Sequence, residues 1–113
     1  MTTPDGITAR HNPDAHTYEL LDDDHVVGTA HYRPFDDSAG PQRIFVHTEV
    51  DETREGEGLG STLAAYALRD TAAAGVAVVP VCRFMKNYLS RHEDLAENAV
   101  AVRPEHLQAI EEH

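Results

Sequence analysis

Cysteine and long apolar runs are scarce in this sequence, and each shortage excludes a class of protein. The single cysteine, Cys82, cannot form an internal disulfide, which fits a reducing compartment. No apolar run approaches the ~18 residues of a membrane-spanning helix. The first residues, MTTPDG, have neither the basic nor the apolar segment of a signal peptide. These absences predict a soluble, cytoplasmic protein.

Basic residues are also scarce. The 113-residue chain has 9 of them, of which only Lys86 is a lysine, against 20 acidic residues, and its formal net charge is −11. Such a surface repels the phosphates of nucleic acids and of anionic membranes, so neither is an expected partner. The apolar content of 41% is that of a folded chain, and the length suits one domain with a modest core.

The predicted elements indicate one α/β (α+β) domain with a mixed, mostly antiparallel sheet. The expected strands cover residues 7–11, 16–21, 25–33, 43–50 and 76–82. The first three form an antiparallel meander, with Pro34 ending the third strand and a loop over residues 35–42. The last strand is almost entirely apolar, as in strands that are covered on both faces.

Helices are expected after the fourth strand. They cover residues 59–74, 84–91 and 105–113. The first is rich in alanine, and Gly75 is expected to end it. Because one predicted strand precedes this helix and another follows it, the three elements predict a right-handed parallel crossover. The last helix is amphipathic only through Leu107 and Ile110.

Three glycines at alternate positions, Gly56, Gly58 and Gly60, join the fourth strand to the long helix. Glycine lets a ligand approach the main chain closely, and a helix N-terminus offers N–H groups and a positive dipole end to an anion. The segment therefore predicts a site for a phosphate-bearing ligand. No lysine follows the glycines as a Walker loop requires, and their spacing does not fit the G-x-G-x-x-G of dinucleotide-binding proteins.

Two motifs carry a resemblance to a known family. The run from Glu55 to Gly60 resembles the [QR]-x-x-G-x-[GA] loop of GNAT-superfamily N-acetyltransferases, with glutamate at its first position. The segment Pro80-Val-Cys-Arg-Phe-Met-Lys-Asn-Tyr88, followed by His92-Glu93, resembles the P-x-C-x-F-x-x-x-[YF] … H-P-E signature of a minimal GNAT subgroup, which also shares His47-Thr-Glu-Val50. The resemblance covers residues 7–95 of a single domain spanning 1–113.

The resemblance implies acetyl-CoA as cosubstrate. The residues expected to bind it are Val50, Glu55, Gly56, Glu57, Gly58, Leu59, Gly60, Ser61, Cys82, Phe84 and Tyr88. A backbone N–H near Val50 would polarise the thioester carbonyl, at a place where the strands of GNAT proteins splay apart. Tyr88 would protonate the leaving thiolate, although an aromatic anchor in the core is an equal reading of this residue.

Three further residues are catalytic candidates, and each also has an alternative structural explanation. Cys82 is either a nucleophile that takes the acetyl group or an inert buried thiol. His47 and Glu49 share one face of a strand, where either could deprotonate an amine, or both could be satisfied by neighbouring polar groups. The other histidines have no metal-ligand spacing, so no metal site is expected.

The function that these patterns favour is transfer of an acetyl group from acetyl-CoA to an amine. A module that binds or senses acyl-CoA without catalysis is the alternative, which the acidic Glu55 and Glu57 favour, and a purely structural domain is a third. The sequence does not name the amine. The resemblance implies a subgroup that lacks the helices usually found between the first two GNAT strands, so the acceptor groove is expected to be either open or completed by a second copy or a partner protein.

Overall fold

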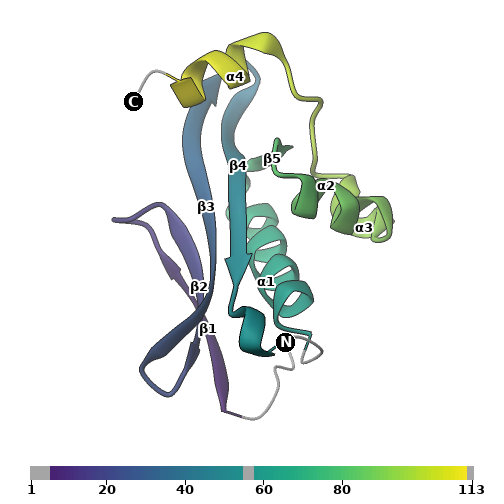
Figure 1. Ribbon diagram of the computed structural model, residues 1–113. Coiled ribbons are helices and arrows are strands. Elements are labelled where there is room, and N and C mark those ends of the chain that lie inside the picture. The colour runs from purple at the N-terminus through teal and green to yellow at the C-terminus, as the bar shows by residue number, and fades with distance from the viewer. Residues whose placement is uncertain (1–5, 55–57, 112–113) are drawn as a thin grey trace.

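One five-stranded sheet organises the protein (Figure 1). The computed structural model describes residues 6–54 and 58–111. The strands, in their order across the sheet, are β1 (Ile7–Asn12), β2 (Thr17–Asp22), β3 (His25–Asp37), β4 (Gly40–Val50) and β5 (Ala77–Pro80). The first four pair antiparallel and β5 pairs parallel to β4, so the predicted mixed, mostly antiparallel sheet of an α+β domain is confirmed.

Helices follow the fourth strand. They are the 3-10 helix η1 (Glu52–Arg54) and the α-helices α1 (Leu59–Ala73), α2 (Arg83–Ser90), α3 (Glu93–Ala96) and α4 (Pro104–Glu111). The long helix α1 packs on one face of the sheet, which we name the inner face; the opposite face is the outer face (Figure 1). Helix α4 lies across the end of the sheet where β3 turns into β4. Among the described helices, none is long and apolar enough to cross a membrane.

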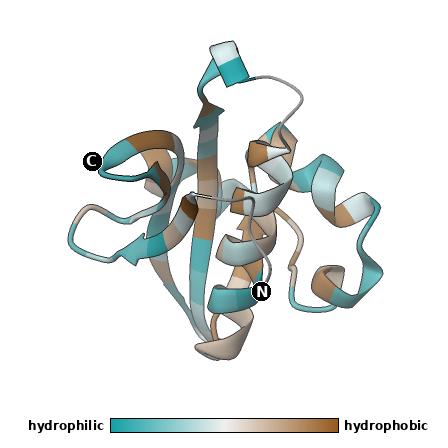
Figure 2. Cartoon of the chain, turned by 90° about the horizontal axis from the view of Figure 1, so that it is seen from below, coloured by the Kyte–Doolittle hydropathy of each residue, from teal (hydrophilic) through white to brown (hydrophobic). Residues whose placement is uncertain are grey.

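The core fills the space between α1 and the inner face. Leu63 and Leu68 of α1 are buried in one cluster with Tyr18, Phe45 and Val78 of the strands. Hydrophobic residues of the strands and of α1 gather at the centre of the molecule, whereas the turns are hydrophilic (Figure 2). Gly75 ends α1 as predicted, with φ at 75°, and the N–H groups of Gly75 and Val76 close the last turn.

The expected end of the third strand at Pro34 is wrong, as is the loop over residues 35–42. Strand β3 continues to Asp37 and pairs with β4 down to Gly40. The N–H of Tyr32 donates to His16 on the β2 side, so the N–H that Pro34 lacks would point the same way, beyond the end of β2. Proline therefore costs this strand no ladder hydrogen bond.

The side chain that holds the C-terminal helix to the sheet is not one of the two that the sequence predicts. Leu107 is 48% exposed, while His106 is fully buried. The His106 ring donates from Nε2 to Oε1 of Gln42 at 2.7 Å and accepts at Nδ1 from the N–H of Arg103 at 3.0 Å. The hydrogen-bonded imidazole of His106, and not an apolar side chain, thus holds the helix. The sequence did not predict this because a hydropathy pattern does not show which polar side chains pair with each other. Before α4, Val78 of β5 exchanges hydrogen bonds with residues 98 and 100, which extends the sheet by one bridge.

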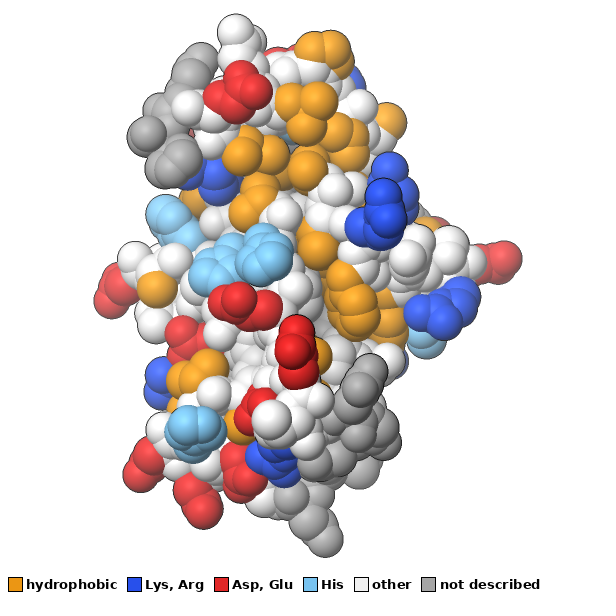
Figure 3. Space-filling model, in the orientation of Figure 1, with side chains coloured by type: hydrophobic (Ala, Val, Ile, Leu, Met, Phe, Trp, Pro, Cys, Tyr) orange, Lys and Arg blue, Asp and Glu red, His pale blue; other side chains and the backbone are white. Residues whose placement is uncertain are grey.

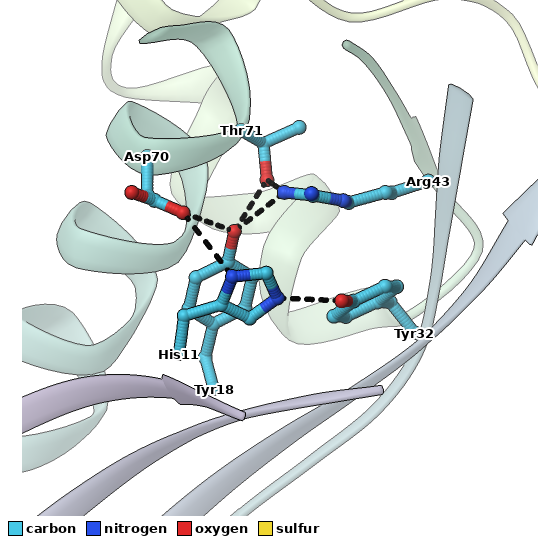
Figure 4. Close-up of polar contacts among 6 residues, drawn as sticks. All are labelled: His11, Tyr18, Tyr32, Arg43, Asp70 and Thr71. Atoms are coloured by element: carbon cyan, nitrogen blue, oxygen red, sulfur yellow. Dashed lines mark hydrogen bonds and ion pairs between the residues drawn. The ribbon is translucent and has the colours of Figure 1, made fainter. Parts of the chain in front are cut away.

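A polar network inside the inner face joins α1 to four strands, β1 to β4 (Figure 4). The Tyr18 hydroxyl donates to Oδ2 of Asp70 at 2.7 Å and accepts from the Arg43 guanidinium at 2.6 Å, and Thr71 contacts both Tyr18 and Arg43. Burial raises the pKa of the Tyr18 hydroxyl above its usual range, and its hydrogen bond to Asp70 raises it further, so it stays a donor. His11 stacks on the Tyr18 ring at 4.3 Å.

Tyr18→Phe tests this network. We expect the free energy of unfolding, measured by urea denaturation, to fall by about 1–3 kcal/mol, because Asp70 and Arg43 each lose a buried hydrogen-bond partner. Tyr66→Phe, which removes a hydroxyl from the same helix outside the network, is the control and should change it by at most about 0.5 kcal/mol. Equal losses in the two variants would show that the network adds no stability of its own.

His106 makes stability depend on pH. Burial lowers the pKa of His106 below 6.5, and the Arg103 guanidinium lowers it further. The unfolded chain therefore binds more protons between that lowered pKa and about pH 6.5, so the free energy of unfolding falls as the pH drops through this window. His106→Gln should flatten part of the decline in urea denaturation between about pH 7.5 and about pH 5.5. His25→Gln, at an exposed site, should keep the wild-type slope, and identical slopes in all three proteins would contradict the assignment.

Candidate active site

The strands β4 and β5 separate halfway along β4. They pair from Gln42 with Ala77 to Phe45 with Pro80, and the last link is the N–H of Cys82 donating to the Phe45 carbonyl at 2.8 Å. Within the described chain, residues 47–50 of β4 pair with β3 on one side and have no strand partner on the other. The sheet therefore opens a gap beside the last part of β4.

One extra residue in β4 sets which side chains face each side of this gap. Tyr32 pairs with Phe45 and His31 pairs with His47, so Val46 is a β-bulge. A bulge reverses the alternation of the side chains that follow it. Phe45 lies in the core of the inner face; without the bulge His47 and Glu49 would join it, but with it they lie on the outer face.

The N–H of Val50 points into the gap. Asp51 donates its N–H to the Val27 carbonyl of β3 at 2.8 Å. Since successive N–H groups of a strand point to opposite sides, the N–H of Val50 points away from β3. A carbonyl oxygen held in the gap could accept this hydrogen bond, which would stabilise negative charge on that oxygen.

A pocket of about 340 Å³ at the outer face and one of about 240 Å³ beside α1 both reach Val50. The pocket beside α1 is lined by Val50, Arg54, Gly58, Leu59, Gly60, Ser61 and Phe84. Six of these seven are residues that the sequence assigns to coenzyme binding, and the structure brings them together. Glu55, Gly56 and Glu57 lie outside the described residues.

The N-terminus of α1 forms the floor of that smaller pocket. Gly58 is its N-cap, with φ at 72°, and no side chain of the described residues caps the helix. The N–H groups of the first turn have no partner within the helix, so they are free to bind an anion. A Cβ at Gly60 would lie 2.8 Å from Cζ of Phe84. Glycine at this position therefore lets the Phe84 ring lie over the helix end.

Arg54 adds a positive charge to this pocket that sequence reasoning missed. Its Nη1 donates to Oδ2 of Asp22 at 2.6 Å, and this contact fixes the guanidinium between the β2 turn and the start of α1. In the sequence, Arg54 is only one charge within a polar turn. Its position depends on a contact 32 residues away.

Cys82 lies where the pairing of β4 with β5 ends, and Tyr88 follows it on α2. Cys82 is buried at the N-cap of α2, and its Sγ lies 3.5 Å from Oγ1 of Thr48. Tyr88 is 6% exposed and stacks on His92, with the ring centroids 3.9 Å apart. Thr48 is a further residue that the sequence did not single out. The bulge at Val46 is what points Thr48 toward Cys82.

His47 and Glu49 share one face of β4, as their spacing predicts, and the bulge makes it the outer face. His47 Nε2 is 3.6 Å from one oxygen of Glu49, and Nε2 of His31 is 3.4 Å from the other. The backbone and side chains around Val50 line the 340 Å³ pocket at this face: Val26, Val27, Gly28, Thr29, Glu49, Val50 and Asp51. Cys82 and Thr48 thus meet on the inner face, whereas His47 and Glu49 lie together on the outer face.

Comparisons with known proteins agree with this geometry. The family model of GCN5-related N-acetyl-transferases matches residues 17–98. A GCN5-like candidate N-acetyltransferase from Staphylococcus aureus has a similar structure at 16% identity, with a TM-score of 0.63, 91% of this chain and 97% of that chain covered. A search of the curated proteins gives no match.

Two larger structures share the fold. One is an aminoglycoside acetyltransferase, meta-AAC0020, from an uncultured soil metagenomic sample, at 14% identity and a TM-score of 0.54. The other is the integron cassette protein HFX_CASS3 from the mobile metagenome of Cole Harbour Salt Marsh, at 18% identity and a TM-score of 0.56. The alignments cover 70% and 73% of this chain but 55% and 54% of those chains, so this chain spans about half their length.

The family model covers more than half of the 113 residues, including the gap, the described part of the glycine segment and α2. The chain belongs to the GCN5-related N-acetyltransferase family and is an acyltransferase.

Proposed function

We propose that this protein transfers the acetyl group of acetyl-CoA to an amine within a ternary complex. The observation that carries the proposal is the gap beside β4, where the Val50 N–H lies between two pockets. One pocket has a helix N-terminus suited to phosphate. The other has the Glu49 carboxylate suited to an amine. A thioester carbonyl bound in the gap would be accessible to the coenzyme from one pocket and to the amine from the other.

The pocket beside α1 suits the pyrophosphate of coenzyme A. Backbone N–H groups of residues 59–61, the dipole of the 15-residue helix and the guanidinium of Arg54 all favour an anion there. The unpaired side of β4 offers N–H and C=O groups to the amides of the coenzyme's arm. Phe84, which is 38% exposed, supplies an apolar surface between these two regions.

The reaction requires one bond to form, one to break and two protons to move. The neutral amine attacks the thioester carbon, and the N–H of Val50 stabilises the oxyanion. The amine proton passes to Glu49, directly or through His47, as the C–N bond forms. The C–S bond then breaks, and Tyr88 protonates the coenzyme A thiolate.

Cys82 offers a second route through the same gap. Its thiol could attack the thioester first, release coenzyme A and hold the acetyl group as a new thioester until the amine takes it. The contact with Thr48 orients the thiol along β4. A module that binds acyl-CoA without turnover remains the alternative from another class, and the two acidic residues of the glycine segment favour it.

Calorimetric titration with acetyl-CoA, followed by assay with a panel of primary amines, tests the proposal. We expect saturable binding of acetyl-CoA, none of ATP or NADH, and release of free thiol only when an amine is present. Binding without thiol release for any amine would favour the sensing module. No binding at millimolar acetyl-CoA would contradict the proposal as a whole.

Intact-mass analysis of the same mixtures separates the two routes. Direct transfer predicts that acetyl-CoA alone adds no mass to the protein. An acetyl adduct that Cys82→Ala abolishes, together with loss of turnover in that variant, would establish the covalent route instead. Cys82→Ser, which keeps a hydroxyl at the site, is the matched control for packing.

Val50→Pro tests the proposed oxyanion donor. Proline removes the N–H that points into the gap and sacrifices no hydrogen bond to β3. We expect kcat to fall by about 10²-fold or more, with the melting temperature and the binding of free coenzyme A close to those of Val50→Ala, which keeps the N–H. Equal kcat in the proline and alanine variants would show that this N–H does not polarise the carbonyl.

A further inference from the structure

His31 has no role in the function proposed above, yet its ring is held against Glu49. His31 comes from β3, and its Nε2 lies 3.4 Å from Oε1 of Glu49. His47 comes from β4, and its Nε2 lies 3.6 Å from Oε2. The two imidazole rings stack with centroids 5.9 Å apart. Each oxygen of one carboxylate is therefore contacted by a different imidazole.

These two contacts restrict the movement of the Glu49 side chain. Glu49 is 62% exposed, and an exposed glutamate samples many rotamers. Contacts from two strands to its two oxygens favour one position and one rotation of the carboxylate. Figure 3 shows histidine side chains gathered over β3 and β4 on the outer face, with acidic side chains beside them.

The place where the carboxylate is held is next to the gap. Glu49 precedes Val50, whose N–H points into the gap, and both line the outer pocket of about 340 Å³. The bulge at Val46 directs His47 and Glu49 to this face, and the register of His31 with His47 sets the second imidazole beside them. The cluster thus depends on pairing between two strands.

We propose that His31 is a positioning residue that, together with His47, clamps Glu49 as the base for the acceptor amine, an inference that rests on the function proposed above. Nε2 of His31 donates to Oε1 of Glu49 at 3.4 Å, and Nε2 of His47 lies 3.6 Å from Oε2. A clamped carboxylate meets the amine proton without first losing rotamer freedom, so the clamp contributes to kcat. It does not contribute to coenzyme binding, because the coenzyme pocket lies on the other side of the gap.

A pair of substitutions at His31 separates clamping from packing. His31→Gln keeps an N–H donor near the position of Nε2, while His31→Leu keeps the bulk and removes the donor. We expect His31→Leu to lower kcat about tenfold and His31→Gln to lower it by no more than about threefold, if Glu49 itself contributes about 10²-fold. The Kd for acetyl-CoA should not change in either variant. Arg33→Leu, one step along the outer face of β3, should retain the wild-type kcat.

A double-mutant cycle with Glu49→Gln gives the decisive comparison. If His31 acts through Glu49, adding His31→Leu to Glu49→Gln should lower kcat no further. A further tenfold loss in that background, a wild-type kcat in His31→Leu, or a weaker Kd for acetyl-CoA in that variant would each overturn the proposal.

The clamp itself can be measured without turnover. Long-range ¹H–¹⁵N NMR spectra of the free protein should show His31 and His47 as Nε2–H tautomers, and Glu49→Gln should shift the ring resonances of both. Unshifted resonances would refute the clamp. A wild-type chain that shows these shifts and binds acetyl-CoA but acetylates no amine would refute the proposed function and, with it, the catalytic role of His31.

Discussion

A single inserted residue in β4 is the constraint on which the site depends. The bulge at Val46 reverses the alternation of the strand between Phe45 and His47. Before the bulge, Phe45 belongs to the core. After it, Thr48 turns toward Cys82, while Glu49 turns toward the outer face. Because β4 leaves β5 at the same point, the reversed side chains border a gap in the sheet.

The polar network of the inner face places α1 relative to that gap. Tyr18 of β2 links the carboxylate of Asp70 on α1 to the guanidinium of Arg43, which lies just before the bulge in β4. The far half of α1 is therefore tied to the sheet by hydrogen bonds through the Tyr18 hydroxyl. Apolar packing of Leu63 and the close contact of Gly60 with Phe84 complete the placement of the N-terminal half. The helix N-terminus consequently lies beside the end of β4.

The two sides of the gap differ in the sign of their local charge. The whole chain carries a formal net charge of −11, which opposes the approach of an anionic coenzyme. Beside α1, the helix dipole and Arg54 oppose that field over a short range, where a phosphate would be bound. At the outer face, Glu49 and Asp51 act with the general field, which favours a cationic amine.

The order of the elements, the phosphate-binding character of the glycine segment and the family motifs could all be predicted from the sequence, because each depends on residues that are close together in the chain. The sequence also singled out most residues of the pocket beside α1, since that pocket is built around one strand–helix turn. Tertiary structure alone decided the rest. The roles of His31, Arg54 and His106 follow from contacts with residues far away in the chain, and the face that Glu49 occupies follows from a bulge that shows only when two strands pair. Pairing register is a property of two segments together, so neither segment's sequence contains it.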